Sequence, residues 1–181
     1  STEVASLLQR NIATRLDAQG RPTPLIAETG GMNAMIVDSS ALTEQVVVDV
    51  LASAFDSAGQ RCSALRVLCL QDDVADHTLK MLRGAMAECR MGNPGRLTTD
   101  IGPVIDAEAK ANIENHIQTM RAKGRPVFQA VRENSEDARE WQTGTFVPPT
   151  LIELASFDEL KKEVFGPVLH VVRYNRNNLN E

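Results

Sequence analysis

The sequence predicts an α/β fold built on an open, mostly parallel sheet with helices on both faces. Short apolar runs alternate with amphipathic helical stretches along the 181 residues, an order that is typical of strands joined by helical crossovers. Several runs, such as Val67–Leu70, are apolar at every position, as expected of strands that are buried on both faces. No internal repeat or low-complexity tract interrupts the pattern.

The expected elements follow from local signals along the chain. Apolar residues at helical spacing, with glycine or a capping residue at the ends, predict helices, and short apolar runs between turn residues predict strands. We expect helices from Ser1 to Ile12, across Val47–Phe55 up to Gly59, at 74–89, and from the Asp106 cap to Gly124. We expect strands at 24–27, 34–37, 67–70, 126–131, 146–152 and 168–174, with a polar surface loop at 132–142.

Composition excludes several classes of protein. Acidic residues outnumber basic ones by 24 to 19, giving a formal net charge of −5, which argues against a nucleic-acid-binding segment. The longest run without a charged residue, Trp141–Ile152, is too short to span a bilayer. Three cysteines without a paired spacing disfavour both a disulfide framework and a structural metal site. We therefore expect a cytoplasmic, metal-free segment.

One segment with chemical potential is AGQRCSA at residues 58–64. Cys62 follows Gly59 and Gln60 at a helix-to-strand junction, where the backbone can approach a ligand, and the neighbouring Arg61 favours the thiolate, which is the nucleophilic form. In the plainer interpretation, Cys62 is a small residue that fills a turn. The other two cysteines are interpreted as structural.

Two carboxylates also stand beside apolar runs. Glu28 follows the run at 24–27 and precedes two glycines, a place at a sheet edge where desolvation would make it a better base. Glu163 stands two residues before Phe165, and a Gly-Pro turn follows. In this arrangement the carboxylate can bind a sugar hydroxyl while the aromatic ring packs on a flat heterocycle. The plainer interpretations are a solvated carboxylate and an ordinary turn.

Taken in chain order, the segments of Glu28, Cys62 and Glu163 resemble the E-x-G-G, G-Q-x-C and E-x-F-G-P segments of the NAD(P)-dependent aldehyde dehydrogenase superfamily. Their separations also fall in the range that the family shows. QRCSA at 60–64 and GTFVPPTLIE at 144–153 further resemble the Δ1-pyrroline-5-carboxylate (glutamate-semialdehyde) dehydrogenase branch, in particular the aldehyde dehydrogenase domain of its bifunctional bacterial members.

The resemblance implies a role for each matching residue. It implies oxidation of L-glutamate 5-semialdehyde to L-glutamate through a cysteine thiohemiacetal and thioester, with reduction of NAD⁺, as the second step of proline catabolism. The implied residues are Cys62 as nucleophile, Glu28 as general base, Glu163 at the nicotinamide ribose, Phe165 beside the nicotinamide, Ser63 at the substrate carboxylate, and Ser1 and Gly30 at the cofactor. In particular, Ser1 would open a helix that faces the pyrophosphate.

The resemblance also implies an organisation of the chain. We expect residues 1–29 to be the C-terminal tail of a Rossmann-like NAD-binding domain, and residues 30–181 to be a catalytic domain truncated at its C-terminus. The chain is then a fragment of a longer protein and inactive alone, because the family's other oxyanion donor precedes Ser1. We expect a homo-oligomer, with FAD, nucleic-acid contact or membrane contact only in other parts of a bifunctional parent.

Three other functions stay open at the level of sequence. One is an aldehyde dehydrogenase of different substrate. Another is a cofactor-independent cysteine hydrolase or acyltransferase, although none of His77, His116 and His170 lies in a recognisable partner motif for a nucleophilic cysteine. The last is a binding module or scaffold without catalysis. Thiol labelling separates the last from the others, because a structural Cys62 reacts no faster than Cys69.

Overall fold

The computed structural model describes residues 2–131 and 143–178. The chain divides into two compact units, Ser1–Gly31 and Met32–Glu181. The expected N-cap Ser1 and the expected surface loop at 132–142 lie outside the described residues.

The first unit consists of one helix and an extended segment. Helix α1 spans Thr2–Ile12, and none of its residues is buried. A turn follows, closed by a bridge between Leu16 and Pro22. The expected strand at 24–27 is wrong: these residues form no strand, and Ile26 is 92% exposed. The apolar run lacks a neighbouring strand to accept its backbone hydrogen bonds, and without that pairing apolar composition does not make a strand.

The second unit is a five-stranded sheet in the order β1-β2-β5-β4-β3. Neighbouring strands are parallel except for β3, which pairs antiparallel with β4 at one edge. The strands are β1 (Asn33–Val37), β2 (Leu65–Gln71), β3 (Val127–Gln129), β4 (Thr150–Leu154) and β5 (Val168–Tyr174). The central strands β2 and β5 are buried over most of their length, as their continuous apolar sequence predicts.

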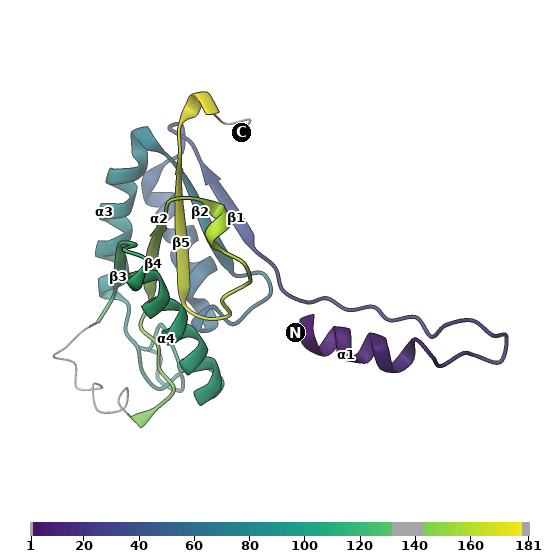
Figure 1. Ribbon diagram of the computed structural model, residues 1–181. Helices are drawn as coiled ribbons and strands as arrows, with labels where there is room; N and C mark the ends of the chain where they lie inside the picture. Colours follow the sequence, from purple (N-terminus) through teal and green to yellow (C-terminus); the bar gives the residue numbers. More distant parts are fainter. Residues whose placement is uncertain (1, 132–142, 179–181) are drawn as a thin grey trace. The chain divides into compact units, whose positions relative to one another are not determined.

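Helices cover both faces of this sheet. They are α2 (Thr43–Phe55), α3 (Asp72–Glu88) and α4 (Ala107–Ala122), with short 3₁₀ turns η1 (Asp56–Gly59), η2 (Phe157–Glu159) and η3 (Arg176–Asn178). In Figure 1, α2 and α3 lie behind the sheet and α4 lies in front of it. The fold class is therefore confirmed as α/β with a mostly parallel sheet.

The limits of several elements differ from expectation for local reasons. Strand β4 begins at Thr150 instead of 146, because Pro148 and Pro149 have no backbone N–H to donate to a neighbouring strand. Helix α4 begins as expected, with the Asp106 carboxylate accepting a hydrogen bond from Ala109 N at 2.7 Å. In the described part of the chain, no helix is long and apolar enough to cross a membrane.

Candidate active site

Two of the segments singled out in the sequence, those of Cys62 and of Glu163 and Phe165, lie at the same edge of the sheet as Asn33. Asn33 begins β1, Cys62 precedes β2, and Glu163 and Phe165 precede β5. These three strands are neighbours and run parallel, so Asn33 and the segments before β2 and β5 lie at the same amino edge. The site therefore lies at the edge opposite to the carboxyl edge at which ligands of open α/β sheets usually bind.

Cys62 lies on an exposed turn between η1 and β2. Its thiol belongs to an exposed residue, and the turn is closed by a hydrogen bond from Ala64 N to Arg61 O at 3.1 Å. The Asn33 amide nitrogen Nδ2 donates to Cys62 O at 2.8 Å and to Ala64 O at 3.0 Å. Asn33 thus fixes the backbone on both sides of the exposed Ser63. A nucleophile on a fixed, accessible turn can attack a carbonyl carbon.

The Arg61 side chain hydrogen-bonds to the end of α2. Its Nη2 donates to Ala52 O at 2.7 Å and to Ser53 O at 3.2 Å, which are carbonyl groups in the last turn of α2. A cation there satisfies helix-end carbonyls and complements the helix dipole. The side chain therefore fastens the cysteine turn to α2, and the expected effect of Arg61 on the thiol stays a prediction.

The turn before Cys62 and the turn before β5 touch through two glycines. Gly59 has φ +65°, and a Cβ added there would lie 2.2 Å from Gly166 O. A Cβ added to Gly166 would lie 2.3 Å from Ile113 Cδ1 on α4. Residues Ser57 and Ala58 also have positive φ, which is uncommon for side chains with a Cβ. The tight backbone contact and the positive φ explain why glycine is needed at position 59, whereas a side chain at position 166 would displace the Ile113 side chain.

Arg66 is a functional candidate that sequence reasoning missed. Its side chain is almost fully buried, and its guanidinium pairs with Glu163 Oε1 through Nε at 3.0 Å and Nη2 at 2.9 Å. It also donates to Gly59 O at 2.7 Å, to Arg61 O at 3.1 Å and to Gly166 O at 3.3 Å. A charged residue amid an apolar strand, as in ALRVLCL, is the signal that could have found it.

Phe165 completes this cluster. The Arg66 Cζ atom lies 5.1 Å from the centroid of the Phe165 ring, within the range of a cation–π contact. The ring is nevertheless 46% exposed, whereas the Glu163 side chain is only 12% exposed. An exposed ring beside a fixed carboxylate is an arrangement that can bind a flat heterocycle and an attached sugar hydroxyl.

Gln60 connects the cysteine turn to the loop before α4. Its Oε1 accepts a hydrogen bond from Ile105 N at 2.9 Å, and its Nε2 lies 3.5 Å from Pro103 O. The loop is held on its other side by Thr145, whose backbone oxygen accepts from Val104 N at 2.9 Å. Contacts of Asn33, Arg66 and Gln60 thus fix the residues that flank Cys62.

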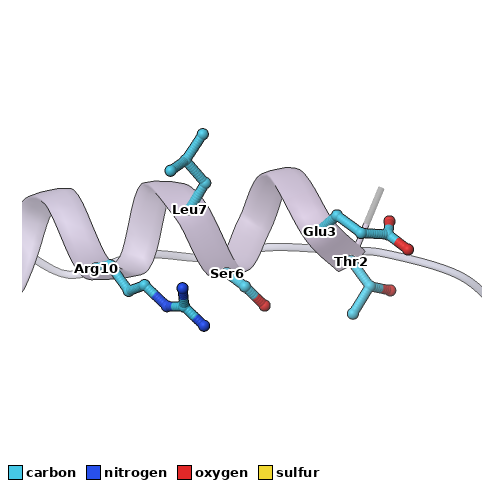
Figure 2. A pocket seen from close by; sticks show the side chains of 5 residues that line it. All are labelled: Thr2, Glu3, Ser6, Leu7 and Arg10. Atoms are coloured by element: carbon cyan, nitrogen blue, oxygen red, sulfur yellow. The ribbon is translucent and has the colours of Figure 1, made fainter.

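Glu28 and Gly30 belong to the first unit. Both are exposed, and Gly30 has φ +41°. Cys62 belongs to the second unit, so the pairing of Glu28 with the Cys62 thiol stays a prediction. On α1, a shallow pocket is lined by Thr2, Glu3, Ser6, Leu7 and Arg10; Figure 2 shows Thr2, Ser6 and Arg10 projecting from the same side of the helix. Hydroxyls and a guanidinium are anion ligands.

The remaining cysteines take no part in the contacts described above, whereas His170 Nδ1 lies 3.2 Å from the backbone oxygen of Arg66. Burial raises the pKa of the half-buried Cys69 thiol, and Cys89 Sγ lies 3.7 Å from Ala85 O within its own helix end. His116 and His170 contact each other, with 2.9 Å between their Nε2 atoms. Over residues 2–131 and 143–178, no group of three or more metal-ligating side chains is found.

Comparison with known proteins identifies the family. The model of the aldehyde dehydrogenase family matches residues 1–180. The chain is 91% identical over 181 residues to the bifunctional protein PutA of Salmonella typhimurium, covering all of this chain and 14% of that protein. It is 59% identical to PutA of Rhizobium meliloti, covering 99% of this chain and 14% of that protein. The chain thus spans about one seventh of the length of these relatives.

More distant relatives and solved structures agree. A 1-pyrroline-5-carboxylate dehydrogenase of Bacillus thuringiensis is 32% identical over 147 residues, or 80% of this chain and 27% of that protein. A crystal structure of bifunctional proline utilization A superposes with a TM-score of 0.87 at 47% identity, over 99% of this chain and 17% of that one.

A betaine aldehyde dehydrogenase variant from Staphylococcus aureus, in complex with NAD⁺, superposes with a TM-score of 0.83 at 27% identity, over 97% of this chain and 35% of that one. The family match covers nearly the whole chain, and the superposed structures share its sheet and helices. Sequence resemblance, sheet topology and these comparisons lead to one conclusion: the chain belongs to the aldehyde dehydrogenase family.

Proposed function

We propose that the protein carrying this chain oxidises L-glutamate 5-semialdehyde, the open form of Δ1-pyrroline-5-carboxylate, to L-glutamate with reduction of NAD⁺. The observation that carries the proposal is an exposed cysteine on a turn that one buried arginine ties to the Glu163 segment. The names of the PutA and 1-pyrroline-5-carboxylate dehydrogenase relatives support the substrate. This reaction is the second step of proline catabolism.

Cys62 begins the proposed reaction. Its thiolate adds to the aldehyde carbon, and the new oxyanion is stabilised by nearby donors such as the Cys62 backbone N–H. NAD⁺, when bound, would serve as the hydride acceptor. Loss of a hydride from the former aldehyde carbon would convert the thiohemiacetal to a thioester. Glu28 then takes a proton from a water molecule, whose oxygen attacks the thioester carbon. Glutamate leaves, and the Cys62 thiol is restored.

The residues of the cluster suit the cofactor chemically. The Glu163 carboxylate can accept hydrogen bonds from ribose hydroxyls, and the exposed ring of Phe165 can pack against the nicotinamide. The α1 segment, with Ser1 at its start and the hydroxyls of Thr2 and Ser6 beside it, can bind a pyrophosphate through backbone N–H groups, although Glu3 opposes the anion. Ser63, exposed beside Cys62, can hold the substrate carboxylate, and Gly30 lets the backbone approach the cofactor.

The wider organisation is proposed on the same grounds. Residues 1–29 are assigned to the tail of an NAD-binding domain and residues 30–181 to the catalytic domain; the division of the chain at Gly31 supports this assignment. We propose a cytoplasmic homo-oligomer, with FAD in a separate proline dehydrogenase domain, because the PutA relatives are named bifunctional. Since the chain spans 14% of those relatives, the activity is proposed for the full-length protein.

The test uses a full-length Salmonella PutA that carries these 181 residues in place of its own. We expect Cys62→Ala to abolish NAD⁺-dependent oxidation of glutamate semialdehyde, and Glu28→Gln to accumulate a thioester on Cys62 that mass spectrometry detects. Cys89→Ala is the matched control and should retain activity. Near-normal turnover by Cys62→Ala contradicts the proposal. Thioester or amide cleavage without NAD⁺ would favour a cysteine hydrolase, and a better rate with another aldehyde would change the substrate.

A further inference from the structure

The buried guanidinium of Arg66 contacts both halves of the proposed site. One edge of the group, Nε and Nη2, meets Glu163 Oε1. Its remaining donors reach the carbonyl oxygens of Gly59 and Arg61, on either side of Gln60 in the cysteine turn. Removing a charge from water is costly unless charged and polar partners surround it, so these contacts determine where each partner can lie.

The contacts fix Glu163 and Phe165 differently. Both Arg66 donors meet the same carboxylate oxygen, Oε1, which restricts the rotation of the Glu163 carboxylate. The Phe165 ring lies 5.1 Å from Cζ, and Gly166 O accepts from Nη1 at 3.3 Å. One side chain that begins in β2 therefore contacts three residues of the segment before β5, namely Glu163, Phe165 and Gly166.

We propose that Arg66 is a positioning residue that sets the proposed cofactor-binding segment, Glu163 to Gly166, against the turn that bears the Cys62 thiol. The proposal rests on the proposed function. Arg66 touches neither thiol nor cofactor in it; it acts through the Glu163 carboxylate and through the two carbonyls that precede Cys62. One guanidinium thereby makes cofactor binding and thiol orientation depend on each other.

The shape of the side chain matters as much as its charge. A guanidinium presents its donors in a rigid plane and leaves a flat face for an aromatic ring, whereas an ammonium is a point charge on a flexible chain. Lysine at position 66 would keep the charge but could not hold Glu163, Gly59 and Arg61 in these directions together while facing Phe165. A role based on charge alone would be preserved by Arg66→Lys.

The test compares Arg66→Lys with Arg173→Lys in the full-length protein described above. Arg173 is the matched control, because its guanidinium also bridges two carboxylates, Asp76 and Glu153, but on β5 away from the cysteine turn. We expect Arg66→Lys to raise the KM for NAD⁺ and to lower kcat, each at least tenfold. It should also change the rate at which iodoacetamide alkylates Cys62 without NAD⁺. Arg173→Lys should change none of these by more than twofold.

The double variant tests whether Arg66 acts through Glu163. If it does, Arg66→Lys combined with Glu163→Gln should have nearly the same kcat/KM for NAD⁺ as the worse single variant. Multiplying effects would show independent roles and overturn the proposal, as would wild-type kinetics of Arg66→Lys.

A third measurement remains if Arg66→Lys fails to fold. Glu163→Gln should then alter the alkylation rate of Cys62, which it does not touch, because the loosened guanidinium no longer holds the cysteine turn. An unchanged rate overturns the coupling. The proposed function fails separately, if Cys62→Ala keeps its activity.

Discussion

A Cβ atom on Gly59 would lie 2.2 Å from the backbone oxygen of Gly166 and 2.9 Å from that of Ala54. Gly59 of the G-Q-x-C segment therefore packs directly against Gly166 of the E-x-F-G-P segment. The two segments are far apart in sequence, and their contact is possible only because Gly59 has no side chain and adopts φ +65°.

Gly59→Ala should therefore be strongly destabilising. An alanine pays about 1–2 kcal/mol for the left-handed backbone and about 1–3 kcal/mol more for displacing backbone atoms that cannot rotate away. We expect the free energy of unfolding, measured by urea denaturation, to fall by the sum of the two.

Gly124→Ala separates these two contributions. Gly124 has φ +74°, but no atom lies within 4 Å of an added Cβ. The free energy of unfolding of this variant should fall only by the backbone contribution, about 1–2 kcal/mol. Equal losses for the two variants would mean that the Gly59–Gly166 contact has no energetic weight.

Asn33→Ala should loosen the cysteine turn. The variant loses the hydrogen bonds from Nδ2 to Cys62 O and Ala64 O, each of which contributes about 0.5–1.5 kcal/mol. We expect a loss of stability of that order and a drop in kcat of the full-length protein. Asn33→Asp should be worse, because it turns a carboxylate oxygen toward two carbonyl oxygens. Asn11→Ala, which removes a hydrogen bond within α1, is the control; if it slowed turnover equally, the effect would not come from the turn.

Cys62 should react with iodoacetamide faster than Cys69 at neutral pH. Cys62 is exposed, whereas Cys69 is partly buried in β2 and its thiol has a raised pKa because of burial. The thiolate is the reacting form, so Cys62 should be labelled several-fold faster than Cys69, as followed by mass spectrometry of tryptic peptides. Equal rates would instead favour Cys62 as a structural turn residue.

The sheet could be predicted well from sequence because a buried strand consists of consecutive apolar residues, which are visible in the local sequence. Strand β5 was expected at 168–174 and has those limits, since every residue in its first half is apolar or, like His170, shielded. The run at 24–27 is equally apolar and forms no strand. Whether an apolar run pairs depends on a partner strand distant in sequence, and no local pattern contains that information.

The candidate site shows the same division. Cys62, Glu163 and Phe165 stood out through short motifs, and the structure brings their segments together. Arg66 was missed because its importance lies in contacts with Gly59 and Glu163, residues that only the folded sheet makes neighbours. The bond from Arg61 to the end of α2 was not expected either, because Ala52 is nine residues away and only the folded helix end brings its carbonyl to the turn.

The paired histidines should make stability depend on pH. Burial lowers the pKa of His170 to about 3; His116 adds to the effect, and the hydrogen bond to the Arg66 backbone opposes it. Burial, together with Lys123 and Lys162, also lowers the pKa of His116. His170 Nδ1 lies 3.2 Å from Arg66 O, so the neutral ring donates there and accepts from His116 at Nε2. Both rings are therefore neutral in the folded protein at neutral pH.

The sign follows from proton binding. In the unfolded chain a histidine takes up a proton near pH 6.5, whereas folded His170 does not until about pH 3. Between these values the unfolded state binds more protons, so stability falls as pH falls, by up to about 1.4 kcal/mol per pH unit for each such histidine. His170→Leu should therefore reduce the dependence of the free energy of unfolding on pH, between about pH 6.5 and 4, by the contribution of one histidine. His77→Gln, at an exposed position, is the control, and an unchanged slope in His170→Leu would show that the buried ring is already charged when folded.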